Sequence, residues 1–249
     1  MTFELSFGET LPDKDQLEQI WLCEIEKVLS AEAMDDRNLS FFVAGVRLAV
    51  RYKSLRKISV SAISNMSGYS RATFFRNFGK YHDFALEGYG LTCKACVQVF
   101  KNKLQGKAMD RSEFVSFTSS FFYGANICVP SDIVRELWTS RQWSQEEFHP
   151  HLPYLARIIG QYLRENEQTR DICVSNSDLL GAIKTLDLDI LITRMDERSI
   201  FPTLDQYRRL SQFLEGFLML NSSDANRPNS LPLGQSNSHT AVQPADKYG

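Results

Sequence analysis

Acidic residues are missing from one long stretch of this 249-residue chain. Between Arg37 and His82 the sequence contains no Asp or Glu, although it contains nine Lys and Arg residues. We call residues 37–82 the acid-free segment. The whole chain holds 28 basic and 30 acidic residues, so everything outside this segment carries a net charge of −11. Such a concentration of positive charge in an otherwise acidic chain indicates a surface that faces an anion.

Long apolar runs and a secretion signal are also lacking. No run of 18 or more apolar residues appears, and the opening MTFELSFGETLPDKDQ does not have the basic-then-apolar order of a signal peptide. The five cysteines are odd in number and scattered, which is typical of reduced thiols rather than of a disulfide framework. We therefore expect a cytoplasmic protein with no membrane partner.

The sequence shows no catalytic constellation: no nucleophile paired with a base, no paired carboxylates and no phosphate-binding loop. Cys93, Cys96, His149 and His151 are of zinc-ligand type, but the cysteines and histidines are more than fifty residues apart and no second Cys pair exists. Buried thiols and a turn histidine are the simpler interpretation. We expect no enzyme, no metal and no cofactor.

Helical periodicity runs through most of the chain, and no segment alternates as a strand, so the predicted fold class is all-α. Two shorter helices are expected within the acid-free segment. The longer expected helices are residues 13–29, 40–53, 83–104, 112–127, 131–142, 151–167, 177–196 and 203–220. Ser40 is the expected N-cap of the second of these. The predicted organisation is an N-terminal extension with one amphipathic helix (1–37), a DNA-binding domain (38–86), a helical effector and dimerisation domain (87–220) and a disordered tail (221–249), which is rich in Asn, Ser, Pro and Gly.

The acid-free segment contains a helix-turn-helix pattern. Two short apolar stretches, VSAISNM and RATFFRNF, follow Ser59 and Ser70, whose hydroxyls can accept a hydrogen bond from the first turn of a helix. Gly68 lies between the stretches and can adopt the positive φ that a tight turn requires. The spacing predicts two helices joined by a turn of three or four residues.

The second helix of the pair has two different faces. Phe74 and Phe78 lie one turn apart and are expected to pack inward, against Ile63 and Val60. Arg71, Ala72 and Arg76 fall on the opposite side. That face is basic, short and of a size that fits the major groove of DNA.

These features resemble the N-terminal domain of the TetR family of bacterial transcription regulators, across residues 40 to 86. The direct matches to the family pattern are Ile63, Gly68, Ser70, Thr73, Phe74 and Phe78. The resemblance implies an N-terminal helix-turn-helix domain, a helical ligand-binding and dimerisation domain, a homodimer bound to double-stranded DNA, and a cytoplasmic, nucleoid-associated location.

The resemblance also implies a set of DNA-contacting residues. They are Ser59, Ser70, Arg71, Ala72, Thr73, Phe75, Arg76, Asn77, Lys80 and Tyr81. Two positions depart from the family, because Phe75 replaces a phosphate-contacting Tyr and Tyr81 replaces the usual Lys. Lys80 or the Tyr81 hydroxyl is the expected substitute. Arg71 and Arg76 are candidates for guanine contacts or for phosphate contacts.

An aromatic row on the expected helix 112–127 has two interpretations. Phe114, Phe117, Phe121 and the later Trp138 either form ordinary core or line a cavity for a small apolar or aromatic effector, with Ser116, Thr118, Ser119 and Asn126 as orienting groups. The last two expected helices carry apolar rows and the small residues Gly181 and Gly216. We expect these helices to form a four-helix dimer interface.

The sequence therefore predicts a ligand-responsive repressor that binds a palindromic operator as a dimer. The alternative is a DNA-associated architectural or protein-interaction factor of the same fold that senses no small molecule. The changed positions Phe75 and Tyr81 motivate this alternative.

Overall fold

The computed structural model describes residues 14–32, 34–128, 136, 151–196 and 204–222. Within these ranges the chain forms nine α-helices and one short 3₁₀ helix, with no β-structure beyond a single bridge between Ile172 and Ser222. The predicted all-α class is confirmed for this part of the chain. The expected helix 131–142, apart from Glu136, and nearly all of the expected tail lie outside the described residues.

The helices follow the predicted order closely. They are α1 (Lys14–Ala31), α2 (Asp36–Tyr52), η1 (the 3₁₀ helix, Leu55–Lys57), α3 (Val60–Ser67), α4 (Arg71–Phe78), α5 (Tyr81–Leu104), α6 (Arg111–Cys128), α9 (Leu152–Glu165), α10 (Asn176–Asp196) and α11 (Leu204–Leu220). One cap was predicted wrongly. Helix α2 begins four residues early, with Asp35 as its N-cap, and Ser40 lies in the second turn, where its hydroxyl donates to the Asp36 carbonyl at 2.8 Å.

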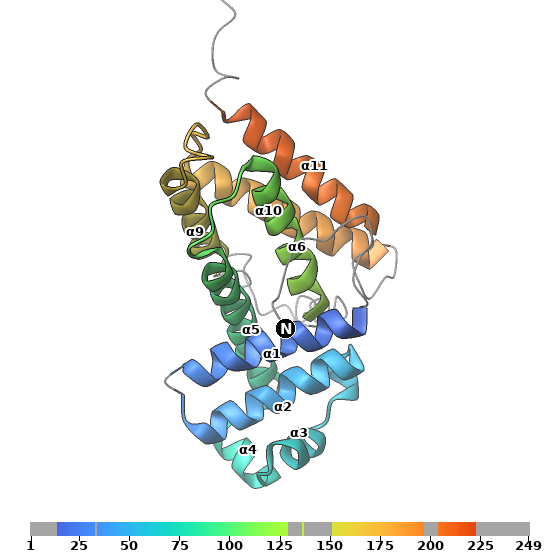
Figure 1. The fold of residues 1–249 in the computed structure, drawn as a ribbon. Coiled ribbons are helices and arrows are strands. Elements are labelled where there is room, and N and C mark those ends of the chain that lie inside the picture. Colours follow the sequence, from blue (N-terminus) through green and yellow to red (C-terminus); the bar gives the residue numbers. More distant parts are fainter. Residues whose placement is uncertain (1–13, 33, 129–135, 137–150, 197–203, 223–249) are drawn as a thin grey trace, which may run out of the picture.

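Two hydrophobic cores organise these helices. The smaller one lies among α2, η1, α3, α4 and the first turn of α5, residues 36–84, which we call the basic unit (Figure 1). Its centre is aromatic: the rings of Phe42 and Phe84 stack with centroids 5.2 Å apart, and Phe41 meets Phe74 edge to face at 5.6 Å. Gly45 leaves room for this stack, because a Cβ there would lie 2.8 Å from the Phe84 ring. Aromatic packing of this kind holds the short helices α3 and α4 on α2.

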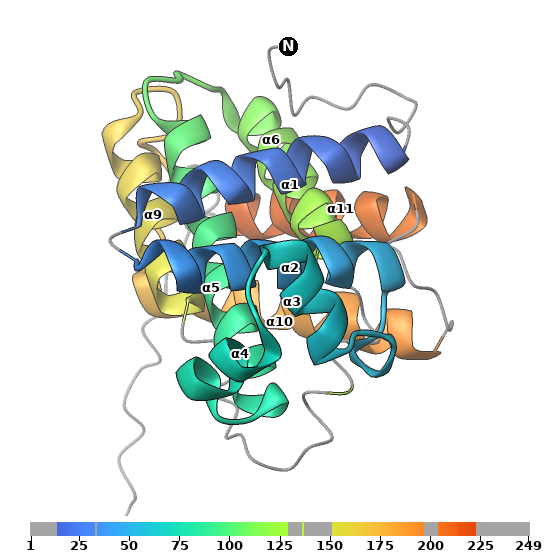
Figure 2. The same ribbon diagram turned by 90° about the horizontal axis from the view of Figure 1, so that it is seen from below.

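The larger core, which we call the main core, joins α1, α5, α6, α9, α10 and α11. Helix α6 lies inside it: from Phe117 to Tyr123 every residue is buried. Figure 2, seen from below, shows α3 and α4 in front of α2, with α1 running alongside α2. The long helix α5 starts in the basic unit and ends in the main core, so it connects the two.

Helix α1 has two partners. Its Trp21, Ile25 and Leu29 are buried in the main core, and Leu22 packs with Val46 and Val50 of α2. The predicted N-terminal extension is therefore an integral helix that lies between the basic unit and the C-terminal helices (Figure 1). The fit against α6 is tight, because a Cβ on Gly124 would overlap the Trp21 indole.

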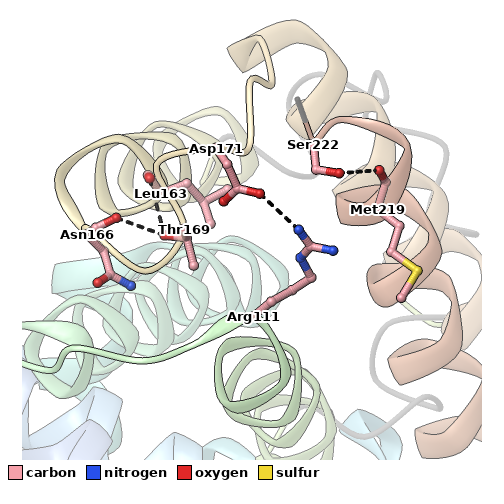
Figure 3. A network of polar contacts seen from close by, with 7 residues as sticks. All are labelled: Arg111, Leu163, Asn166, Thr169, Asp171, Met219 and Ser222. Atoms are coloured by element: carbon pink, nitrogen blue, oxygen red, sulfur yellow. Dashed lines mark hydrogen bonds and ion pairs between the residues drawn. The ribbon is translucent and has the colours of Figure 1, made fainter. Parts of the chain in front are cut away.

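Polar contacts close the end of the main core (Figure 3). Arg111 donates to the Asp171 carboxylate at 3.1 Å, and the buried Thr169 hydroxyl donates to the Leu163 carbonyl at 3.2 Å. The Cys173 amide donates to the Asn221 carbonyl at 2.8 Å. The first of these bonds attaches α6 to the segment that follows α9, and the last attaches the end of α11 to the same segment.

None of the described helices combines the length and the apolar character that a membrane span needs.

Candidate nucleic-acid interface

The turn between α3 and α4 has the geometry that the sequence predicts. The Ser59 hydroxyl accepts from the Ala62 amide at 3.1 Å, and the Ser70 hydroxyl accepts from the Thr73 amide at 3.1 Å. Gly68 adopts a φ of +77°. Both predicted caps and the glycine turn are confirmed. They determine where α3 ends and in which direction α4 leaves the turn.

Helix α4 buries one face and exposes the other. Phe74 is fully buried beside Ile63, and Phe78 packs half-buried against the same core. Arg71, Ala72 and Arg76 are exposed, as are Phe75 and Asn77. The predicted division of the helix into an apolar and a basic face is therefore confirmed, and the exposed face is free of carboxylates.

Two of the predicted contact residues on α4 already have polar partners. The Thr73 hydroxyl lies 2.9 Å from the Ser70 hydroxyl, and the Asn77 amide donates to the Asn38 side-chain oxygen at 2.8 Å. Asn38 lies in the first turn of α2, and the sequence did not indicate this role, because 39 residues separate it from Asn77. This bond attaches the exposed end of α4 to α2.

Lys80 and Tyr81 behave differently at the start of α5. Lys80 is exposed, whereas the Tyr81 hydroxyl donates to the Leu55 carbonyl at 3.0 Å. Burial, together with the nearby Glu136 carboxylate, raises the pKa of Tyr81 to about 12. The Tyr81 hydroxyl thus makes its hydrogen bond inside the protein. Of the two substitutes expected for the family's Lys, Lys80 is the side chain that faces solvent.

Helix α1 neutralises part of the positive charge of the acid-free segment. Arg47 forms a bidentate salt bridge with the Glu26 carboxylate, with nitrogen–oxygen distances of 2.6 and 2.7 Å. Lys53 lies 2.7 Å from Glu18, and both of these side chains are largely buried. Five other cations, Arg51, Lys57, Arg71, Arg76 and Lys80, are exposed and make no ion pair within the described part of the chain.

A carboxylate distant in sequence holds the 3₁₀ helix in the basic unit. Glu136 accepts from the Ser54 hydroxyl at 3.1 Å and from the Leu55 amide at 3.0 Å, and it lies 3.7 Å from Arg56. It caps the start of η1, where unpaired amides carry partial positive charge. No sequence pattern links positions about eighty residues apart, so this contact was not foreseen.

The predicted effector residues lie in the main core. Phe114, Phe117 and Phe121 are buried, and Trp138 lies outside the described residues. The Phe121 ring contacts Phe100 at 4.6 Å and Trp21 at 5.4 Å between centroids. These rings therefore pack against other aromatic side chains.

Three hydroxyls next to this aromatic packing have no partner. Thr118, Ser119 and Ser120 are at most 1% exposed, and none of the three hydroxyl oxygens has a hydrogen-bond partner among the residues that the structure describes. Buried polar groups are normally bonded, since leaving one unpaired costs about 1 to 3 kcal/mol. Thr118 and Ser119 belong to the predicted orienting groups.

An apolar row is exposed on α11. Phe213, Met219 and Leu220 are 38%, 48% and 74% exposed, and the Phe213 ring stacks on Phe217 with centroids 6.5 Å apart. Gly181 on α10 and Gly216 on α11 have open space where a Cβ would stand. The apolar rows that suggested the dimer interface in the sequence are instead largely buried in the main core of the single chain, as Leu179, Ile183 and Leu186 on α10 and Leu210 and Leu214 on α11 show. The apolar surface that remains accessible on α11 is a different one, formed by Phe213, Met219 and Leu220.

No group of three or more His, Cys, Asp or Glu side chains among the described residues is arranged to hold a metal ion. Cys93 and Cys96 are buried in α5 and form no disulfide within the described part of the chain.

Comparison with protein-family models, with curated proteins and with solved structures finds no match. The resemblance to the TetR family accordingly rests on the helix-turn-helix residues of the acid-free segment.

Proposed function

We propose that this protein is a sequence-specific DNA-binding regulator of transcription, most simply a repressor, which binds a two-fold operator as a homodimer. The observation that carries the proposal is the exposed face of α4. This face presents Arg71, Ala72 and Arg76 to solvent within a segment that lacks carboxylates, and the buried Phe74 fixes its orientation. Arginine on a helix of this kind pairs with guanine or with phosphate oxygens.

Support for a dimer comes from the exposed apolar row on α11. Large exposed apolar surface on a soluble helical protein marks an interaction site. A two-fold dimer would place two copies of α4 on the same side of a duplex, where their spacing must match one turn of DNA, about 34 Å.

Support for a small-molecule effector comes from the three unpaired hydroxyls of α6. A ligand with an apolar body and one or two hydrogen-bonding groups would satisfy Thr118 and Ser119 and would contact the aromatic rings nearby. To act as a switch, this ligand must bind one spacing of the two α4 helices better than the other. Helices α5 and α1 connect the main core to the basic unit, and so a tilt of either would change that spacing.

Selection from a pool of randomised duplexes tests the proposal directly. The purified protein should enrich a palindrome, and the affinity for it should fall steeply as salt rises, because Lys and Arg side chains displace counterions from phosphates. Arg76→Ala should weaken binding by about 1 to 3 kcal/mol per half-site if Arg76 reads a base, and it should leave the oligomeric state unchanged. Equal, salt-insensitive binding to any duplex would rule the proposal out.

The alternative is an architectural or protein-interaction factor of the same fold that senses no small molecule. The dense packing of Phe117 and Phe121 favours it, since these rings already contact other side chains. Mapping of bound sites across the genome separates the two functions. A few promoters would support the regulator, and many scattered sites would support the architectural factor.

A further inference from the structure

Exposed apolar side chains accompany the exposed cations of the helix-turn-helix. Met66, Tyr69 and Phe75 are 43%, 37% and 43% exposed, and they lie within ten residues of the chain. Single exposed apolar residues are common on protein surfaces. Three in so short a stretch, at the end of the molecule that also carries unpaired Arg and Lys, indicate a surface that contacts another molecule.

Phe75 is the one that lies within α4. It is one helical turn after Arg71 and three residues after Ala72, so it borders the exposed basic face. Its ring meets the buried Phe74 edge to face, with centroids 5.5 Å apart. The contact with Phe74 holds the Phe75 ring on its protein side, and much of the ring remains open to solvent.

The chemistry of Phe75 limits what it can recognise. A phenyl ring has no hydrogen-bond donor, and thus it cannot bind a phosphate oxygen as a tyrosine at the same position would. In the major groove, the 5-methyl group of thymine is the apolar feature that a phenyl ring can contact. We propose that Phe75 reads a thymine methyl group in each half of the operator, an inference that rests on the proposed DNA binding.

The surroundings of Phe75 favour DNA over a protein partner. Arg71 and Arg76 lie on either side of it along α4, both exposed and without an ion pair in the described part of the chain. Phosphate groups line both edges of the major groove and match such flanking charges. A thymine methyl in the floor of the groove would then face the ring.

Replacement of thymine by deoxyuridine tests this contact, because it removes the methyl group and leaves base pairing intact. The probe is the palindromic duplex that the wild-type protein selects from a randomised pool, with each symmetric pair of thymines replaced in turn. At one pair, the dissociation constant for the wild-type protein should rise about fourfold per half-site, the equivalent of one buried methyl group. Phe75→Ala should bind the parent duplex more weakly and should show no further loss at that pair.

Tyr154→Ala is the matched control. Tyr154 is 38% exposed but lies on α9, so this variant should retain the wild-type response to deoxyuridine. The inference is overturned if no thymine pair is sensitive, or if Phe75→Ala keeps the full loss, which would assign the methyl contact to another residue such as Ala72. If the wild-type protein enriches no duplex at all, the proposed DNA binding fails, and this inference fails with it. A selected palindrome without methyl sensitivity overturns only the role of Phe75.

Discussion

Tyr81 illustrates how a residue expected at a DNA contact can instead hold the protein together. Its hydroxyl is bonded to Leu55, and burial raises its pKa to about 12, above the ordinary value near 10. The unfolded chain therefore loses the phenol proton at a lower pH than the folded protein does. The stabilisation by neutral Tyr81 is complete below pH of about 10 and is lost as pH rises to about 12.

We expect Tyr81→Phe to lower the free energy of unfolding by about 1 kcal/mol at pH 7, because the Leu55 carbonyl loses its partner. The variant should also lose less stability than the wild type between pH 10 and 12. Urea unfolding at several pH values measures both effects. Identical pH profiles for the two proteins would show that the phenol is not protected by folding.

The unpaired hydroxyls of α6 lead to a second prediction about single residues. Ser119→Ala and Thr118→Val remove a buried oxygen without a partner, so each should raise the free energy of unfolding by about 1 kcal/mol in the absence of ligand. The same changes should weaken the effect of an effector on operator binding. Thermal or urea unfolding of the purified variants provides the first measurement.

Thr92→Val is the matched control, because the buried Thr92 hydroxyl donates to the Gly88 carbonyl at 2.7 Å. It should not gain stability. Equal losses in all three variants would mean that the α6 hydroxyls are not a source of instability.

At the scale of helices, the sequence predicted the helix-turn-helix well and the role of α1 poorly. Caps and apolar spacing are local signals, so Ser59, Gly68 and Ser70 could be identified from neighbouring residues alone. The partners of Glu18 and Glu26 lie 35 and 21 residues away, and nothing local marks them. The nine cations of the acid-free segment therefore looked equivalent in the sequence, although α1 pairs with two of them.

This pairing predicts which cations contribute to the salt dependence of DNA binding. Each phosphate contact adds about −0.9 to the slope of log affinity against log salt. Lys80→Gln should make the slope shallower by about 0.9 per protomer, since Lys80 is exposed and unpaired. Arg47→Gln should leave the slope unchanged, because Arg47 is bound to Glu26. Titrations of one duplex at several salt concentrations compare the two variants, and equal slope changes would contradict the assignment.

At the scale of the whole molecule, the exposed row on α11 bears on assembly. Phe213→Glu places a charge on an apolar surface that a partner subunit would bury, so it should convert dimers to monomers and weaken operator binding while leaving the helical content unchanged. Tyr154→Glu changes a similarly exposed aromatic residue on another helix and should remain dimeric. Sedimentation analysis of both variants reports the assembly state. If Phe213→Glu remains a dimer, the dimer interface does not include the exposed row on α11.

The two partners of α1 also bear on the order in which the chain acquires structure during synthesis. The core of the basic unit draws on residues between Met34 and Leu91, all close in sequence, and contacts of this kind form early. The main core joins Trp21 to residues as late as Leu218. Helix α1 packs on α2, α5 and α6, and its Trp21 ring contacts Phe121 of α6. We therefore expect the basic unit to fold while the ribosome is still adding the C-terminal helices, and α1, although made first, to bury its apolar face only after α5 and α6 have been added.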